Sequence, residues 1–180
     1  PKAGCTLVAD SCTGPSDTSA EYTCSVSLQY HADPTDADTA YTAENWLSTV
    51  VAEDDDGATD AAESPQGVEV LSLAAFRMTK SLSYGALVVG DIIDPLSVIT
   101  TLINTGNVGL NQELSGTDLR RENTSIAVTN QRWSLAAATG FAEGNVLTQT
   151  PTLSEIRVPK SISANSPAQK NIWWGIAVPN

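Results

Sequence analysis

The sequence predicts an all-β protein, a sandwich or barrel of about eight short strands. Apolar and polar residues alternate over several short segments, as they do in half-buried strands. Clusters of Gly, Pro, Asn, Asp and Ser separate these segments, a composition typical of turns. Helix signals are sparse, and no stretch divides the chain convincingly. We therefore expect a single domain over residues 1–180, with an eight-stranded jelly roll as the favoured arrangement and one or two short helices in its loops.

The segment YTCSVSLQY, residues 22–30, has the clearest strand pattern. Its larger side chains all fall at alternate positions: Tyr22, Cys24, Val26, Leu28 and Tyr30. Small polar residues fill the positions between them, so one face of the segment is apolar and the other polar. We expect a half-buried strand here.

Residues 42–53, TAENWLSTVVAE, are a candidate helix with a Thr-x-x-Asn start. The apolar residues that follow this start are Trp46, Leu47, Val50 and Val51. An acidic surface loop is expected after them, at about residues 52–67. Val68 and Val70 then alternate within GVEVLSL, which predicts a second strand.

The segment LSVITTLI, residues 96–103, supports two interpretations. Its β-branched residues favour a third strand. Asp94 and Pro95 directly before it are also a good cap and first turn for a helix. Both alternatives stay open on the sequence alone.

Three strands are expected in the last third of the chain. The first is within residues 124–138, where Ile126 and Val128 alternate. A second lies near LSEIRVPKSI and ends at Pro159, and the last is NIWWGIAV, residues 171–178. In the last of these strands the side chains of Trp173 and Trp174 must point to opposite faces. One tryptophan would fill the core, and the other would be exposed or would pack against a neighbouring subunit.

The charge of the chain is large, negative and uneven. The net charge is −12 and the isoelectric point about 4.2. Residues 1–76 carry one lysine and fourteen acidic residues, whereas residues 77–180 carry eight basic and seven acidic ones. Such a charge repels nucleic-acid phosphates, so we expect no direct binding of nucleic acid. Low lysine and abundant Asp and Glu are typical of proteins from high salt, where repulsion is screened.

Hydropathy gives no sign of a membrane segment. No window of about 18 continuous apolar residues occurs, and the richest run, residues 86–103, is interrupted by Asp91, Asp94 and Pro95. The N-terminal PKAGCTLVADSC lacks the long apolar stretch of a signal peptide. We expect no insertion into a membrane.

Three cysteines, Cys5, Cys12 and Cys24, all lie in the first 24 residues. One pair can close, and the third is then free, buried or bonded to another chain. Cys5 and Cys12 are one candidate pair across a short hairpin. The C-x2-C spacing of a zinc site is absent. A disulfide would place the mature protein outside a reducing cytosol.

The acidic stretch AEDDDGATDAAE can be aligned with a calcium loop. With Gly57 at the turn, Asp54 and Asp56 fall at ligand positions and Glu63 at the bidentate end. The first ligand position is then Ala52, which has no side-chain oxygen. We therefore predict no specific metal site, with Asp54, Asp56 and Glu63 as weak candidates only.

No motif predicts catalysis or a cofactor. His31, the only histidine, could serve a hydrolase of the Ser-His-Asp type, but G-x-S-x-G does not occur. The segment GNVGLN lacks the context of a nucleotide fingerprint. Paired carboxylates and four tryptophans leave a sugar-binding role open, although only 6% of the residues are aromatic. We expect a protein that is not an enzyme and that holds no cofactor.

The C-terminal sequence IRVPKSISANSPAQKNIWWGIAVPN resembles the last strands of single jelly-roll capsid proteins. In size, composition and layout the whole chain is similar to the smaller major capsid protein of icosahedral, internal-membrane viruses of halophilic archaea, the sphaerolipovirus type.

The resemblance implies a jelly roll that stands upright in a capsid shell. The subunit would assemble with itself and with a second, larger capsid protein into pseudo-hexameric capsomers. Interface or cross-link candidates are Cys5, Cys12, Cys24, Trp173 and Trp174. The acidic first half would face the brine. Two alternatives remain: a secreted halophilic β-sandwich that binds a polysaccharide or cell-surface ligand, and a small hydrolase that uses His31.

Overall fold

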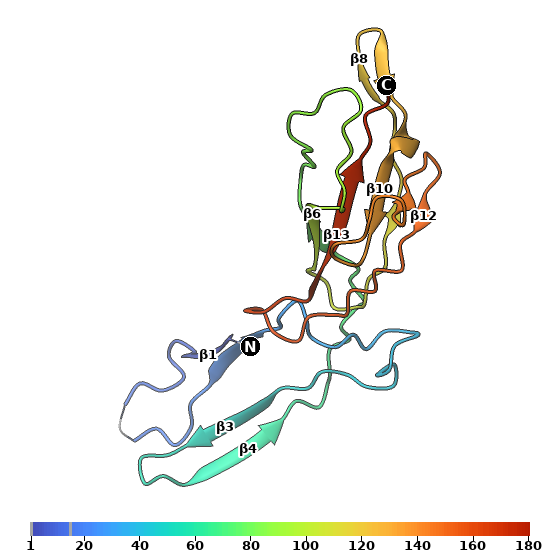
Figure 1. Ribbon diagram of the computed structural model, residues 1–180. Coiled ribbons are helices and arrows are strands. Elements are labelled where there is room, and N and C mark those ends of the chain that lie inside the picture. The colour runs from blue at the N-terminus through green and yellow to red at the C-terminus, as the bar shows by residue number, and fades with distance from the viewer. Residues whose placement is uncertain (1, 15) are drawn as a thin grey trace.

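The chain divides into a packed C-terminal part and an extended N-terminal part (Figure 1). The computed structural model describes residues 2–14 and 16–180. Regular structure in these residues is almost entirely antiparallel β, with one short 3-10 helix, η1 (Val128–Asn130). We call residues 2–75 the arm and residues 76–180 the body. The all-β prediction is confirmed.

The body is built on one five-stranded antiparallel sheet of order β11-β10-β13-β6-β5. Its strands are β5 (Phe76–Met78), β6 (Val98–Asn104), β10 (Gln131–Ser134), β11 (Asn145–Val146) and β13 (Gln169–Ile176). A two-stranded sheet of β7 (Glu113–Leu114) and β12 (Thr152–Leu153) supplies further core residues. A hairpin of β8 (Leu119–Arg121) and β9 (Thr124–Ile126) extends from the end of the body (Figure 1).

The central strand β13 shows why this sheet forms. Its residues Ile172, Trp174 and Ile176 alternate towards the core and are buried. Burial of side chains of this size contributes roughly 1.5–3 kcal/mol each. The indole Nε1 of Trp174 donates a hydrogen bond of 2.8 Å to Thr100 Oγ1 on β6, so its one polar atom is satisfied inside the core.

The core lies entirely in the body among the residues that the structure describes. It comprises Leu96, Leu102, Leu114, Val128, Trp133, Leu147, Ile156, Val158, Ile172, Trp174 and Ile176. These side chains come from the five-stranded sheet, from η1 and from the segments around β7 and β12. The body therefore has the apolar interior that a folded domain needs.

The arm contains two hairpins and no comparable core. The first pairs β1 (Lys2–Leu7) with β2 (Tyr22–Ser27), and the second pairs β3 (Thr49–Glu53) with β4 (Thr59–Glu63). Every residue of β2, β3 and β4 is exposed. In Figure 1 both hairpins project away from the body, in blue and cyan.

Two buried amides hold the turn after β6, and one of them joins it to the arm. The fully buried Asn104 donates from its side chain to the carbonyls of Val108, at 2.7 Å, and Pro159, at 3.0 Å. The side chain of Asn107 donates to the Leu71 carbonyl and accepts from the Leu73 N–H. The end of the arm is thus bonded to the turn that follows β6.

Several local predictions were wrong. Residues 42–53 are not a helix: Tyr41–Glu44 form turns, and β3 begins at Thr49, because Val50 and Val51 are β-branched and pair with β4. The expected acidic loop is mostly the β3–β4 hairpin. Around Val68 there is only a bridge to Trp46 rather than a strand.

The ambiguity at residues 96–103 is resolved in favour of a strand. Residues Val98–Asn104 form β6, which pairs with β13 on one side and with β5 on the other. The segment around Tyr22 is a strand as expected, but both of its faces are exposed rather than one being buried. The final strand, predicted from NIWWGIAV, is confirmed as β13.

Candidate functional site

The β1–β2 hairpin carries an apolar face that nothing covers. Cross-strand pairing places Leu7 opposite Tyr22 and Ala3 opposite Val26, and these pairs share a face with the paired Cys5 and Cys24. The other face carries Thr6, Thr23 and other small polar residues. Tyr22 is 61% exposed and Val26 47%. A strand pair of this pattern normally packs its apolar face on another layer.

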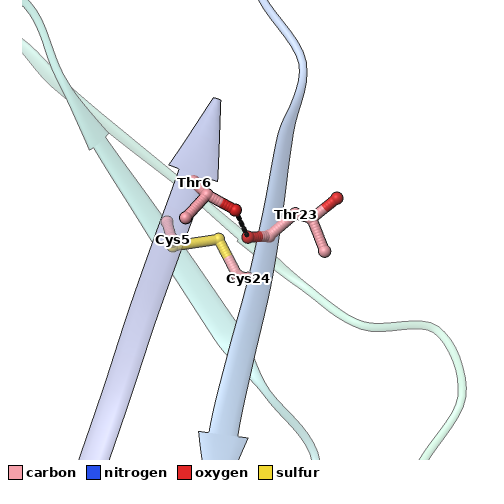
Figure 2. The surroundings of a disulfide bond; sticks show 4 residues. All are labelled: Cys5, Thr6, Thr23 and Cys24. Atoms are coloured by element: carbon pink, nitrogen blue, oxygen red, sulfur yellow. Dashed lines mark hydrogen bonds between the residues drawn. A yellow bond between two sulfur atoms is a disulfide. The ribbon is translucent and has the colours of Figure 1, made fainter. Parts of the chain in front are cut away.

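A disulfide between Cys5 and Cys24 holds this hairpin (Figure 2). Beside it, the Thr6 hydroxyl donates to the Thr23 carbonyl at 3.5 Å. Of the pairings that the sequence left open, the candidate Cys5–Cys12 does not form, because Cys12 lies beyond the end of β1 while Cys24 lies directly opposite Cys5. Cys12 is a free, exposed thiol.

The rest of the arm repeats this pattern of exposed apolar side chains. In the arm the large ones are Leu7, Tyr22, Val26, Leu28, Tyr41, Trp46, Leu47, Val50, Val51, Val68, Leu71 and Leu73. These twelve exposed side chains lie on 74 residues that have no buried apolar core of their own, whereas the eleven on the 105 residues of the body surround one. The apolar surface of the arm is therefore the candidate functional surface of this protein.

The accessible surface gives the size of what is uncovered. The chain exposes 12,292 Å², whereas a compact monomer of 18.8 kDa exposes about 8,300 Å². The excess is about 4,000 Å². A standard protein–protein interface takes about 800 Å² from each partner. The uncovered surface is thus large enough for several contacts.

The weak calcium candidates are separated by the hairpin. Asp54 Oδ1 accepts hydrogen bonds from the N–H groups of Asp56, at 3.1 Å, and Ala58, at 2.7 Å, so it closes the β3–β4 turn. Glu63 lies at the far end of β4, opposite Thr49. Over residues 2–14 and 16–180, no group of three His, Cys, Asp or Glu side chains is placed to hold a metal ion.

His31 is placed at the joint of arm and body rather than beside a serine. Its ring meets Tyr30 edge-on at 5.2 Å, and its buried Nδ1 has no hydrogen-bond partner. The nearby Asp33 carboxylate binds the Lys160 ammonium instead. Lys160 also donates to the His31 carbonyl at 3.4 Å. This arrangement fixes the arm to the body and does not form a Ser-His-Asp triad.

Two arm carboxylates are held by backbone N–H groups. The backbone N–H of Ser72 lowers the pKa of Asp36 below its ordinary value, and the Ser72 hydroxyl adds to this effect. The corresponding bonds measure 2.9 Å and 2.8 Å. The backbone N–H of Thr13, followed by that of Gly14, likewise lowers the pKa of Asp17. Both groups order loops of the arm.

Only one tryptophan of the pair at the C-terminus is available at a surface. Trp174 is in the core, while Trp173 is half-buried on the opposite face of β13 and lies next to the exposed Ile99 of β6. The alternation predicted from the sequence is therefore confirmed. Whether Trp173 meets another subunit stays a prediction.

A cleft in the body was not predicted from the sequence. It encloses about 540 Å³ between β11 and β12, within the usual range for ligand sites. Three exposed apolar side chains, Leu135, Val146 and Leu153, line it. Ser154 also lines the cleft, and its buried Oγ has no hydrogen-bond partner. These residues come from three separate segments, so no local sequence signal could have grouped them.

Comparisons with family models, curated proteins and solved structures find no match to this chain. In the part of the chain that the structure describes, no helix has the length and apolar character to cross a membrane.

Proposed function

We propose that this protein is a structural subunit, a major capsid protein of an icosahedral virion. It assembles with copies of itself and with a second, larger capsid protein into pseudo-hexameric capsomers. In this proposal the body is the core of a single jelly roll, and the shell belongs to a virus of a halophilic archaeon that encloses a membrane.

The observation that carries the proposal is the uncovered apolar surface of the arm. Burial of apolar area contributes about 25 cal/mol per Å², so leaving this surface in water forgoes a large stabilisation. A subunit that acquires neighbours recovers it. Obligate interfaces of 2,000–5,000 Å² or more in total are apolar in the same way.

The charge and the disulfide support the proposal that the protein works in high salt and in oxidising surroundings. The arm holds a net charge of −13, from one lysine against fourteen acidic residues. Such a surface stays hydrated, and its repulsion is screened, in molar salt. An intrachain disulfide persists in oxidising surroundings, as at a virion surface.

The particle mass tests this function. The full chain, alone and with any jelly-roll protein encoded beside it, would be analysed by sedimentation velocity in molar potassium chloride. We expect concentration-dependent assemblies much heavier than the 18.8 kDa chain. A monomer under all these conditions would reject the proposal.

The second candidate function is a secreted binding module for a polysaccharide or cell-surface ligand. The cleft between β11 and β12 favours it, because its size and mixed lining suit a small polar ligand. Titration of the monomer with soluble polysaccharides, followed by tryptophan fluorescence, distinguishes the two. Saturable binding that Leu153→Asp abolishes would support the module.

A further inference from the structure

The arm carries an apolar face without a described layer to cover it, and the body carries a cleft that is lined by both apolar and polar side chains. On the arm, Leu7, Tyr22 and Val26 share the uncovered face of the β1–β2 hairpin. On the body, Leu135, Val146 and Leu153 surround the cleft. In Figure 1 the hairpin points away from the body, so one copy does not cover its own cleft.

Both walls of the cleft are strands at the edge of a sheet. β11 ends the five-stranded sheet, and β12 pairs only with β7. Edge strands present backbone groups that another chain can pair with. Ser154 lines the cleft, and its buried Oγ has no hydrogen-bond partner among the described residues. The two edge strands and the mixed apolar and polar lining therefore suit the cleft to receive a polypeptide.

Charge decides which surface of a neighbour meets the arm. Two arms in contact would bring together two segments of −13 each, whereas the body carries eight basic and seven acidic residues. Like charges placed together across an interface cost several kcal/mol. An arm therefore packs more favourably on a body than on another arm.

We propose that the apolar face of the β1–β2 hairpin of one copy packs into the cleft between β11 and β12 of a second copy, with Tyr22 as the largest side chain of that face. This inference rests on the proposed function, and it specifies the surfaces through which two copies of the chain would contact each other. Tyrosine is favoured at such positions because its ring buries a large area while its hydroxyl still finds a partner. The contact is heterologous, so it closes into a ring or continues as a chain of subunits.

Paired variants test the contact in the full chain, by sedimentation velocity in molar potassium chloride. Tyr22→Asp places a charge on the apolar face of the hairpin, and Leu153→Asp places a charge in the cleft. Each substitution is expected to weaken self-association at least tenfold. Thr23→Asp, on the opposite face of the same strand, is the control for Tyr22→Asp. Val88→Asp, at an exposed apolar residue outside the cleft, is the control for Leu153→Asp. Both controls should associate as the wild type does.

Mixing the two disabled chains gives the sharpest result. The Leu153→Asp chain keeps an intact hairpin and the Tyr22→Asp chain an intact cleft, so the mixture should form one-to-one heterodimers at concentrations at which each variant alone, weakened at least tenfold, is still monomeric. If Leu153→Asp associates normally while Tyr22→Asp does not, the hairpin meets some other surface and the inference is overturned. The intrinsic fluorescence of the four tryptophans and the intact mass of the chain with its Cys5–Cys24 disulfide verify that each variant is folded.

These experiments distinguish a failure of this inference from a failure of the proposed capsid function. If the wild type assembles, and the Tyr22→Asp and Leu153→Asp variants assemble equally well, the inference is overturned but the proposed capsid function is not. A wild-type chain that stays monomeric, alone and with a companion jelly-roll protein, would overturn both.

Discussion

At the scale of single residues, the disulfide between Cys5 and Cys24 stabilises the β1–β2 hairpin. The hairpin that they close has no buried side chain in β2, and its hydrogen bonds are open to water. The bond joins positions 19 apart. Closing a loop of about 20 residues removes about 3 kcal/mol of entropy from the unfolded chain. For a hairpin without a core, this term decides whether the strands pair at all.

Replacing both cysteines, as Cys5→Ser with Cys24→Ser, should therefore unfold the hairpin and leave the body intact. The double change avoids a new pair with Cys12. We expect rapid proteolytic cleavage within residues 2–27, while the body, residues 76–180, resists the protease as it does in the wild type. Cys12→Ser is the control and should be cleaved no faster than the wild type. Equal cleavage of both variants would show that the disulfide does not hold the hairpin.

Asp36 predicts a local dependence on pH. Its folded pKa lies below the ordinary 3.8 because the Ser72 N–H and hydroxyl stabilise the carboxylate. A lowered carboxyl pKa contributes stability that is present above the ordinary value and lost as the pH falls through the folded value. The Ser72 amide resonance in NMR should thus titrate with a midpoint below 3.8. Asp36→Asn should abolish that titration, and a midpoint above 3.8 would contradict the assignment.

At the scale of elements, periodicity predicted the central strand of the body, but it did not predict every strand correctly. The strand expected near LSEIRVPKSI and ending at Pro159 was wrong, because only Thr152–Leu153 form a strand there and Val158 makes an isolated bridge. In the strand expected within residues 124–138, Val128 lies in η1 instead. The final strand was predicted because Ile172, Trp174 and Ile176 repeat every two residues and face one core. The helix expected over residues 42–53 was wrong, because Val50 and Val51 gain more from pairing with β4 than from a helix. Local patterns could not show that β2 has no layer against it, since that depends on distant segments.

The joint between arm and body depends on a glycine that no pattern singled out. A Cβ on Gly106 would collide with the Leu73 carbonyl oxygen, whereas one on Gly109 would find its nearest atom at 3.8 Å. Gly106→Ala must therefore push the arm away from the turn after β6. We expect a loss of about 1–3 kcal/mol, typical of overpacking.

Urea unfolding of Gly106→Ala and Gly109→Ala, followed by circular dichroism, measures this difference. Gly109→Ala is the matched control, in the same connection and with ordinary space around it, and should stay close to the wild type. Hydrogen exchange should also accelerate at the Leu73 and Asn107 amides in Gly106→Ala alone. Similar midpoints for the two variants would mean that the joint tolerates the displacement.

At the scale of the whole molecule, two opposing terms act on the arm. Its apolar surface favours contact with another chain, while its charge of −13 opposes any contact at low salt. The Debye length falls from about 10 Å in 0.1 M salt to about 3 Å in 1 M salt. Association through the arm should therefore appear only when salt has screened the repulsion.

Charge removal should shift that salt requirement without touching the apolar face. Asp55→Asn, Asp56→Asn and Glu63→Gln together remove three charges from the β3–β4 hairpin, and they keep Asp54, which closes its turn. We expect the triple variant to associate at a lower salt concentration than the wild type, and with a weaker dependence on salt, in sedimentation experiments across a potassium chloride series. Asp91→Asn, Asp94→Asn and Glu143→Gln, three changes in the nearly neutral body, form the comparison and should shift the midpoint less. If both triples shift it equally, net charge alone controls assembly, and the acidic arm has no special part in it.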